Sequence, residues 1–518
     1  MRLLTYIANL GVLSSSSRES VKIQVKEETM ASLGIEESMV PEAVSWMIAH
    51  GGVYALPSID MEKLDEKYQK GGAFNHAPFA LAPFPWPLKE YEKVKNLQPT
   101  INRIIDRVSR NSDWLHATLK ETVVSDDFTR RLLHLYDNFP NPQSLALGLL
   151  RSDYMLDEPS VGENEILDYP DSTRSLQVEI NTIASSFACL SETVSNLHIY
   201  LNEKVSAIEE EKLPLNPAGQ GMAAAIAAAH NAYCTQQNTS NPKTVVMIVQ
   251  PGERNQMDQR KLEHWLWSNH NVRLIRLSLA QIAQQAQIQE DQGCLILKNH
   301  LEVSVVYYRA GYSPNDYPTE TEWSARQLIE TSLAIKCPSA AYHLVGTKKV
   351  QQALAAPGQL EHFLLPTDPP VTQVRQLFAG LFDLDQAAGH NADKAVNDAI
   401  ASPHAFVLKP QREGGGNNLY DQQLVDALQS MIPAQRSAYI LMERINSKPR
   451  TGALVRDAIL RAGPCIAELG IYGTILTDGP NLELYNTVPG HLLRQKLLGV
   501  NEGGVAAGFA VLSSPKLV

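Results

Sequence analysis

Several features that mark other protein classes are scarce in this sequence of 518 residues. Only five cysteines are present, they are widely spread, and none forms a CxxC pair, so we expect neither a disulfide framework nor a structural zinc site. No stretch approaches the roughly 18 consecutive apolar residues of a membrane-spanning helix. We therefore expect buried free thiols in a reducing compartment, and no membrane partner.

Basic charge is also in deficit, with 45 lysines and arginines against 56 acidic residues and a net charge of −11. Nucleic-acid binders generally carry a basic surplus, so we expect no nucleic-acid partner. The overall charge does not exclude a local basic pocket for a small anion. The contents of hydrophobic residues (44%) and charged residues (19%) are those of an ordinary globular protein. At this length, two or three domains are expected.

The first 39 residues are predicted to be an N-terminal extension. The opening MRLLTYIANLGVLSSSSRES has two arginines, a serine run and a single acid near its end, as organellar transit peptides do. It shows no clean cleavage site, and Met30 offers an alternative start. We expect a disordered extension or a targeting segment, and a cytoplasmic protein.

The remaining sequence divides into three parts by its periodicity. Residues 40–241 contain helical patches, an expected strand that opens residues 175–187, and an alanine-dense helix. Residues 242–347 alternate buried strands with amphipathic helices, which indicates a parallel sheet covered on both faces. Residues 348–518 hold short strands around a glycine run, followed by strands that we expect to be antiparallel. The sequence thus predicts the α/β class, with α+β elements outside residues 242–347.

The glycine run KPQREGGGNN, residues 409–418, combines features of a phosphate site. Lys409 ends an apolar strand, and consecutive glycines allow backbone amides to approach an anion closely. Glu413 is compatible with a neighbouring phosphate if a cation such as Mg²⁺ lies between them. Neither GxxxxGK[ST] nor GxGxxG is present, and a bare triple glycine is more often a flexible loop. Both interpretations stay open on this run alone.

Three other fragments bear on the choice. Glu179 and Asn181 are two residues apart on an expected strand, so their oxygen atoms face the same way and suit a hard metal. Arg494 and Lys496 precede a second Gly-Gly. Lys348 stands at an expected helix start, where backbone amides and a cation can hold phosphate. A solvated strand face or a surface basic patch would explain each fragment by itself.

Taken in order, these pieces resemble the eukaryotic glutathione synthetases, a family of ATP-grasp ligases. The resemblance runs in family order over about residues 80–518. It is carried by LRSDYM (150–155), VEINTIASSF (178–187), ERNQMDQR (253–260), VVYYRAGY (305–312), CPSAAYHLVGTKKVQQ (337–352), FVLKPQREGGGNNLY (406–420), YILME (439–443), ELGIYG (468–473), GHLLRQK (490–496) and GGVAAG (503–508).

The resemblance implies a circularly permuted ATP-grasp fold with an inserted parallel α/β substrate-binding domain at residues 242–347. The ligase body would then comprise residues 40–241 and 348–518. It also implies that ATP phosphorylates the cysteinyl carboxylate of γ-glutamylcysteine, and that glycine then displaces phosphate to give glutathione. Mg²⁺ would be the cofactor, and the family is usually homodimeric.

The resemblance also assigns residues to roles, position by position. Catalysis is assigned to Arg151, Lys409 and Arg494, and the metal to Glu179, Asn181 and Glu413. ATP contacts are assigned to Glu179, Lys348, Lys409, Gly414, Gly415, Gly416, Asn418, Tyr420, Met442, Glu443, Ile445, Glu468, Lys496 and Glu502. Substrate contacts are assigned to Arg151, Ser185, Ser186, Glu253, Asn255, Gln259, Arg309, Tyr312, Arg494, Val505 and Ala506.

A few positions depart from the family pattern. Ala310 stands where an acidic residue commonly follows the arginine, and Glu502 where an aspartate commonly contacts the nucleotide. Because the order of serine and alanine is reversed in IASS, Ser186 is the safer assignment than Ser185.

The acceptor amine is predicted from one dipeptide. Synthetases that use β-alanine have bulkier residues in place of the two alanines of GGVAAG, so Ala506 and its neighbour favour glycine. The alternatives are a ligase with another acceptor amine, and a non-catalytic nucleotide-binding derivative of the fold. The presence of the complete magnesium set and of both phosphate lysines argues against the derivative.

Overall fold

A computed structural model describes most of the chain. The described residues are 30–31, 33–56, 74–158, 169–205, 209, 212–237, 241–298, 300–412, 416–500, 503–505 and 508–518. Predictions for the N-terminal extension up to residue 29, and for Glu413, Gly414, Gly415, Glu502 and Ala506, lie outside them. Within the described ranges, no helix combines the length and the apolar character needed to cross a bilayer.

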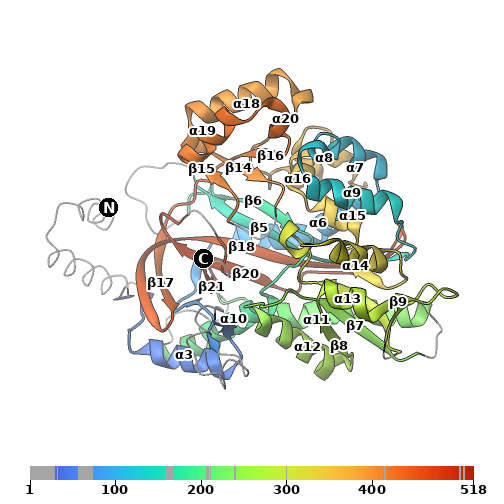
Figure 1. Ribbon diagram of the computed structural model, residues 1–518. Coiled ribbons are helices and arrows are strands. Elements are labelled where there is room, and N and C mark those ends of the chain that lie inside the picture. The colour runs from blue at the N-terminus through green and yellow to red at the C-terminus, as the bar shows by residue number, and fades with distance from the viewer. Residues whose placement is uncertain are drawn as a thin grey trace.

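An eight-stranded sheet forms the centre of the molecule (Figure 1). It joins strands from distant parts of the chain, and β18 pairs antiparallel with β5, β19 and β20. The antiparallel pairing predicted for the strands at residues 463–476 and 482–486 is therefore confirmed. Along the sheet the strands are β17 (Arg450–Arg456), β3 (Phe79–Ala80), β21 (Val511–Ser513), β20 (His491–Leu497), β18 (Ile459–Asp478), β5 (Leu145–Asp157) and β6 (Arg174–Asn181), with β19 (Leu482–Thr487) beside β18.

Helix α6 (Leu88–Ser109) packs against β18 and covers one face of this sheet. Its apolar positions, including Ile101 and Ile105, are buried in the largest hydrophobic cluster. Close approach depends on Gly473 of β18, where a Cβ atom would lie 2.1 Å from Asn102 Oδ1. The neighbouring helices are α7 (Ser112–Leu119), α8 (Thr122–Ser125), α9 (Asp127–Asn138) and α15 (Ala340–Val345).

The predicted parallel α/β unit is present at the lower right of Figure 1. Strands β8 (Leu274–Leu277), β7 (Lys243–Ile248), β11 (Glu302–Tyr308) and β12 (Ile335–Cys337) pair in parallel. Both faces are covered, because Val245 and Met247 belong to one hydrophobic cluster and Val246 and Ile248 to another. The helices around this sheet are α11 (Ala218–Gln236), α12 (Gln256–His270), α13 (Leu279–Gln285) and α14 (Glu320–Glu330), whereas α10 (Ala188–Val205) packs against α11 and α12 and against β20 and β21 of the central sheet.

One edge of this sheet differs from the predicted parallel arrangement. Strands β9 (Ala286–Ile288) and β10 (Leu295–Leu297) pair antiparallel, and β10 joins β11 antiparallel. Each has only three residues, which is too short for a periodic hydrophobic pattern to be recognised.

A small four-stranded sheet lies at the top of Figure 1. Its order is β13 (Leu381–Phe382), β16 (Tyr439–Glu443), β14 (Phe406–Pro410) and β15 (Leu419–Tyr420), with helices α18 (His390–Ala401), α19 (Asp421–Ser430) and α20 (Pro433–Arg436). It has its own small hydrophobic cluster, which includes Leu408, Leu424 and Leu441. In the sequence, the glycine run connects β14 to β15.

The remaining elements of the described residues are α3 (Met39–Ala49), β1 (Val53–Ala55), β2 (Phe74–His76), β4 (Phe84–Trp86), α16 (Lys348–Ala355), α17 (Val371–Arg375), β22 (Pro515–Leu517) and the 3₁₀ helices Pro314–Asp316, Leu360–His362, Gln386–Ala388 and Pro403–Ala405.

Candidate active site

A cluster of charged side chains lies on one face of the central sheet. Arg151 of β5 is directly opposite Asn181 of β6, and Glu468 of β18 is directly opposite Arg494 of β20. Because residues two apart on a strand share a face, Asp153 joins the same cluster. The sheet thus brings together residues that are hundreds of positions apart in the sequence.

Asp153 forms the centre of this cluster. It accepts hydrogen bonds from Nε and Nη2 of Arg151 at 2.6 and 2.9 Å, and from Nη2 of Arg494 at 3.0 Å. The Nδ2 of Asn181 also donates to it at 3.0 Å. Arg494 forms a second ion pair, with Glu468. Burial opposes the charge of Arg494, but these two carboxylates outweigh it and raise its pKa, so the guanidinium stays charged.

A second set of charges is centred on Glu179 of β6. The ammonium of Lys348, the first residue of α16, lies 3.1 Å from a carboxylate oxygen of Glu179. Burial opposes ionisation of Glu179, yet the fields of Lys348, Lys409 and Arg494 lower its pKa below the usual range. Lys409 of β14 donates from Nζ to the carbonyl oxygen of Val178 at 2.8 Å. Two cations from different elements therefore converge beside one carboxylate.

A cavity of about 820 Å³ adjoins this set and lies between the small sheet and the central sheet. It is large enough for a nucleotide, and its walls mix apolar side chains with charged ones. The predicted ATP contacts among its lining residues are Lys409, Asn418, Tyr420, Met442, Glu443, Ile445 and Lys496. Glu179, Lys348, Gly416 and Glu468 lie outside the lining. Met155, His404 and Ile466 line the cavity but were missed by the sequence analysis.

Five further predicted substrate residues lie in the segments that follow the carboxyl ends of β7 and β11, namely Glu253, Asn255, Gln259, Arg309 and Tyr312. Val505 is instead buried in a hydrophobic cluster. Arg309 donates to Asp258 at 2.9 Å, and both are buried. Asp258 also accepts the backbone N–H groups of Phe187 and Cys189, at 2.9 and 3.0 Å, so it caps the start of α10. In open α/β sheets, the carboxyl ends of parallel strands are the usual place for a ligand.

Glu253, Asn255 and Gln259 lie together in the same region. Glu253 accepts the backbone N–H of Asn255 at 2.7 Å and the side-chain amide of Gln250 at 3.2 Å. The Oδ1 atom of Asn255 is buried and makes no hydrogen bond within the described part of the chain. Because an unpaired buried polar atom is costly, this oxygen is a candidate contact for a polar ligand.

A tight turn at residues 184–187 connects the two groups. The carbonyl oxygen of Ser186 accepts Nη1 of Arg151 at 3.3 Å and the hydroxyl of Tyr472 at 2.6 Å. The Ser185 hydroxyl donates to the carbonyl of Leu149 at 3.0 Å, which favours Ser186 for ligand contact. Two non-glycine residues of the turn, at positions 184 and 187, have φ values of 51° and 74°, a strained conformation often found at functional sites.

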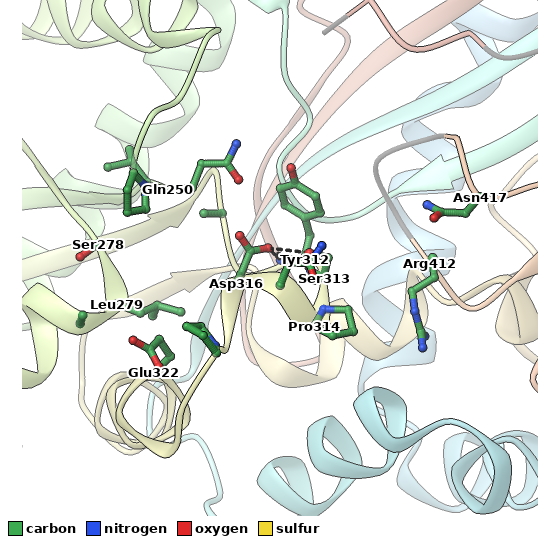
Figure 2. A pocket seen from close by; sticks show the side chains of 16 residues that line it. Gln250, Ser278, Leu279, Tyr312, Ser313, Pro314, Asp316, Glu322, Arg412 and Asn417 are labelled. Carbon is green, nitrogen blue, oxygen red and sulfur yellow. Dashed lines mark hydrogen bonds between the residues drawn. The ribbon is translucent and has the colours of Figure 1, made fainter. Parts of the chain in front are cut away.

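A second cavity, of about 670 Å³, lies beside these substrate residues (Figure 2). Gln250, Tyr312 and Asp316 line it, and Asp316 accepts the backbone N–H of Tyr312 at 3.1 Å. Arg412 and Asn417, which flank the triple glycine in the sequence, lie on the other side of the cavity from Gln250 in Figure 2. The glycine run therefore begins and ends beside the substrate residues as well as beside the nucleotide cavity.

Three buried residues of the site were not selected from the sequence: Asp153, Asp258 and Tyr472. A signal existed for the first, because Asp153 follows Arg151 by two residues and must share its face of the strand. Asp258 lies within ERNQMDQR, but its partner Arg309 is 51 residues away. Tyr472 is directly opposite Arg151 only because β18 pairs with β5.

Comparison with known proteins gives a consistent result. The sequence model described as "Eukaryotic glutathione synthase, ATP binding domain" matches residues 35–517. The chain is 40% identical to the glutathione synthetase of Dictyostelium discoideum over 488 residues, which are 92% of this chain and 98% of that protein. It is 40% identical to the chloroplastic glutathione synthetase of Arabidopsis thaliana, covering 93% and 85% of the two chains. It is 39% identical to the human glutathione synthetase, covering 85% and 90%.

The fold also has a solved counterpart. A glutathione synthetase-like effector from Globodera pallida, in its apo form, superposes with a TM-score of 0.72 over 93% of this chain and 96% of the other. The sequence identity is 20%, so this likeness concerns the fold alone.

Proposed function

The chain belongs to the eukaryotic glutathione synthase family, and on that premise we propose that it uses ATP to join γ-glutamylcysteine to glycine. The products are glutathione, ADP and phosphate. The reaction proceeds in two steps: the cysteinyl carboxylate takes the terminal phosphate of ATP, and the glycine amine then displaces that phosphate from the acyl group.

The position of Lys409 is the observation that carries this proposal. It lines the 820 Å³ cavity, and its Nζ lies 2.8 Å from the carbonyl of the residue before Glu179. Lys348 approaches the same carboxylate from α16. Cations already in place on both sides of a transferring phosphoryl group stabilise the charge that develops there. The adenosine part of ATP then occupies the cavity, and its phosphates lie against these lysines.

Glu179 and Asn181 would hold the Mg²⁺ of the nucleotide, together with Glu413. Their donor set suits a hard cation, because carboxylate and amide oxygens are the ligands that Mg²⁺ prefers. The NH₂ group of Asn181 faces two acceptors, Asp153 and the carbonyl of Arg151. Its Oδ1 therefore points away from them and is available to a cation. When bound, the metal neutralises charge on the phosphates.

The described residues hold no group of three or more His, Cys, Asp or Glu side chains placed to bind a metal.

The dipeptide binds between the two clusters. Arg494 would meet its reacting carboxylate through Nε and Nη1, because a guanidinium fork pairs well with carboxylates. Arg151, whose Nε and Nη2 bind Asp153, would contribute the N–H of Nη1 that the carbonyl of Ser186 does not take. Arg309, Glu253 and the orphan oxygen of Asn255 would hold its γ-glutamyl end. The glycine-rich run at 414–416 would cover the phosphates and exclude water, which would otherwise hydrolyse the acyl phosphate.

The decisive experiment is a coupled assay of ADP release from ATP, γ-glutamylcysteine and glycine, with each omitted in turn. Dependence on all three supports the proposal. ADP release with β-alanine in place of glycine, at a higher rate than with glycine, identifies the ligase with another acceptor. Nucleotide binding without ADP release under any combination identifies a non-catalytic derivative.

We also propose a homodimer and a cytoplasmic location. The family resemblance supports the dimer, and light scattering of the purified protein tests it. Two relatives are named chloroplastic, those of Arabidopsis thaliana and Solanum lycopersicum. A fluorescent reporter fused behind residues 1–39 distinguishes the two locations: diffuse fluorescence supports the cytoplasm, and fluorescence in an organelle contradicts it.

A further inference from the structure

We propose that Asp153 is a positioning residue, which holds Arg151, Arg494 and Asn181 in the orientations in which they meet the dipeptide and the metal. The inference deepens the proposed function and rests on it. It concerns a residue that has no assigned role and that touches neither ligand itself.

Asp153 is buried, and both oxygens of its carboxylate accept hydrogen bonds. Its exposed fraction is 0%. Oδ1 accepts Nε of Arg151, while Oδ2 accepts Nη2 of Arg151, Nη2 of Arg494 and Nδ2 of Asn181. Both oxygens are thus occupied by protein donors and neither reaches solvent. Such a carboxylate acts through its partners rather than on a substrate.

Arg151 is fixed most tightly of the three. Two of its nitrogens bind the two oxygens of Asp153, the parallel arrangement that defines the plane of a guanidinium group. The third nitrogen, Nη1, is then directed at the carbonyl of Ser186, 3.3 Å away. The carboxylate of Asp153 therefore fixes the orientation of the Arg151 guanidinium group relative to the strained segment at 184–187.

Arg494 is held by one nitrogen only. Its Nη2 lies between Asp153 and Glu468, which neutralise much of its charge from one side. No hydrogen bond from its Nε or Nη1 to any described residue is present. These two donors are the ones that an incoming carboxylate or phosphate can use.

The amide of Asn181 is oriented by the same oxygen. Asp153 and the carbonyl of Arg151 take both protons of its NH₂ group, at 3.0 and 3.3 Å. Without Asp153, the amide could rotate and present its NH₂ group to the metal instead of its oxygen. Partners of this kind commonly change metal affinity or activity by about 10–100-fold when they are removed.

Gly470 supports the inference from the opposite strand. It lies directly across from Asp153, and a Cβ atom built there would be 2.6 Å from Asp153 Oδ1 and 2.7 Å from Arg151 Cδ. A side chain at this position would therefore displace the pair of Arg151 and Asp153. Gly470→Ala perturbs Asp153 without removing its charge, which gives a second and independent test.

A purely structural ion pair is the competing explanation. Buried pairs often contribute little to stability, and breaking one mainly leaves an uncompensated charge. That explanation predicts a loss of stability with unchanged affinity for ligands in the folded fraction. The positioning role predicts weaker binding of the dipeptide and of the metal in a protein that remains folded.

The test compares wild type, Asp153→Asn and Gly470→Ala, with Gly463→Ala as the control. Gly463 lies on the same strand, and a Cβ there meets only Leu497 Cδ2, at an ordinary 3.7 Å. Calorimetry measures γ-glutamylcysteine binding. Electron paramagnetic resonance measures Mn²⁺ binding in the presence of a non-hydrolysable ATP analogue, and thermal unfolding establishes that each variant is folded.

We expect both Asp153→Asn and Gly470→Ala to weaken dipeptide and Mn²⁺ binding by about 10–100-fold. Binding of the metal-free ATP analogue should stay within about twofold of wild type, because the adenosine cavity is unchanged. The control should match wild type throughout. A folded Asp153→Asn protein with wild-type affinities for both ligands overturns the inference. If Asp153→Asn does not fold, Gly470→Ala decides by the same criterion.

The two proposals fail in different ways. If wild type does not bind γ-glutamylcysteine, the proposed function is wrong, and the Mn²⁺ measurement still decides the role of Asp153. If wild type binds neither ligand, both are wrong.

Discussion

Lys348 lies 3.1 Å from Glu179, and this ion pair connects the start of helix α16 to strand β6. The next residue, Lys349, faces the opposite way and pairs with Asp383 and Asp385, at 2.6 and 2.7 Å. Two consecutive lysines at the start of one helix therefore form ion pairs with carboxylates in different parts of the structure. The first is the proposed contact of the nucleotide phosphates, and the second anchors the segment around β13.

The two lysines provide a matched pair of variants. Lys348→Met should lower ADP release by about 10²–10³-fold, because it removes a preorganised cation from the phosphate site. Lys349→Met should leave ADP release near the wild-type rate but lower the melting temperature, since two carboxylates lose their buried partner. The coupled assay and thermal unfolding measure these effects. Equal loss of activity in both variants would contradict the division of roles.

Lys409→Met should abolish phosphate release while leaving the fold intact. Its Nζ contacts a backbone carbonyl and Met442 Sδ, so methionine fits the space and removes the charge together with the hydrogen bond to the carbonyl of Val178. The control is Lys394→Met, at an exposed lysine of α18 that pairs with Asp398. Wild-type turnover by the Lys409 variant, measured as phosphate released per enzyme, would remove this residue from the mechanism.

The parts of the fold that could be predicted are those encoded locally. Strand β14, which contains Lys409, the doubly covered β7 and the helix beginning at Lys348 each have a pattern within one short segment. The neighbours of each strand could not be predicted, because they depend on pairings such as β5 with β18, which joins Arg151 to Tyr472.

The difference between local and distant signals also explains which site residues were predicted from the sequence and which were missed. Glu179 and Asn181 are next-but-one neighbours with ligand chemistry, so the sequence alone suggests them. Asp153 has the same spacing from Arg151, but its importance lies in bonds to Arg494, 341 residues further on. A role that depends on a partner on a distant strand cannot be recognised from the spacing of neighbouring residues.

Arg494→Ala should raise the KM for γ-glutamylcysteine more than that for glycine. The guanidinium is directed at the region where the dipeptide carboxylate is expected, and alanine removes the donors that would bind it. Arg461→Ala, at an exposed position of β18, is the control and should change neither value. Steady-state kinetics with each substrate varied in turn provides the measurement, and a larger change for glycine would reverse the assignment.

Gly473→Ala should destabilise the protein by about 1–3 kcal/mol, the usual cost of overpacking a core. The new methyl group would lie 2.1 Å from Asn102 Oδ1 and 2.7 Å from Gln98 Nε2. Both side chains are fully buried and bonded to each other at 2.9 Å, so they have little room to move away. Denaturant unfolding of this variant beside Gly463→Ala, which has space for its methyl group, measures the difference. Equal stability of the two would show that helix α6 can shift.

Acid sensitivity should depend on His198, which is buried between α10 and the central sheet. Its ring contacts Ser514 Oγ at 2.6 Å and the carbonyl of Ala80 at 2.8 Å, a pairing that a neutral imidazole satisfies. Burial lowers the pKa of His198 from 6.5 to about 4. Between those pH values the unfolded chain binds a proton at His198 and the folded chain does not, so the free energy of unfolding falls as pH falls.

His198→Gln removes this titration and should flatten the pH dependence. A shift of this size corresponds to roughly 3 kcal/mol, lost by wild type relative to the variant between about pH 6.5 and pH 4. Denaturant unfolding across that range measures it, with the exposed His270→Gln as the control that should follow wild type. Parallel curves for wild type and His198→Gln would mean that the folded protein accommodates the imidazolium, with Nδ1–H donating to Ser514 Oγ and Nε2–H to the carbonyl of Ala80.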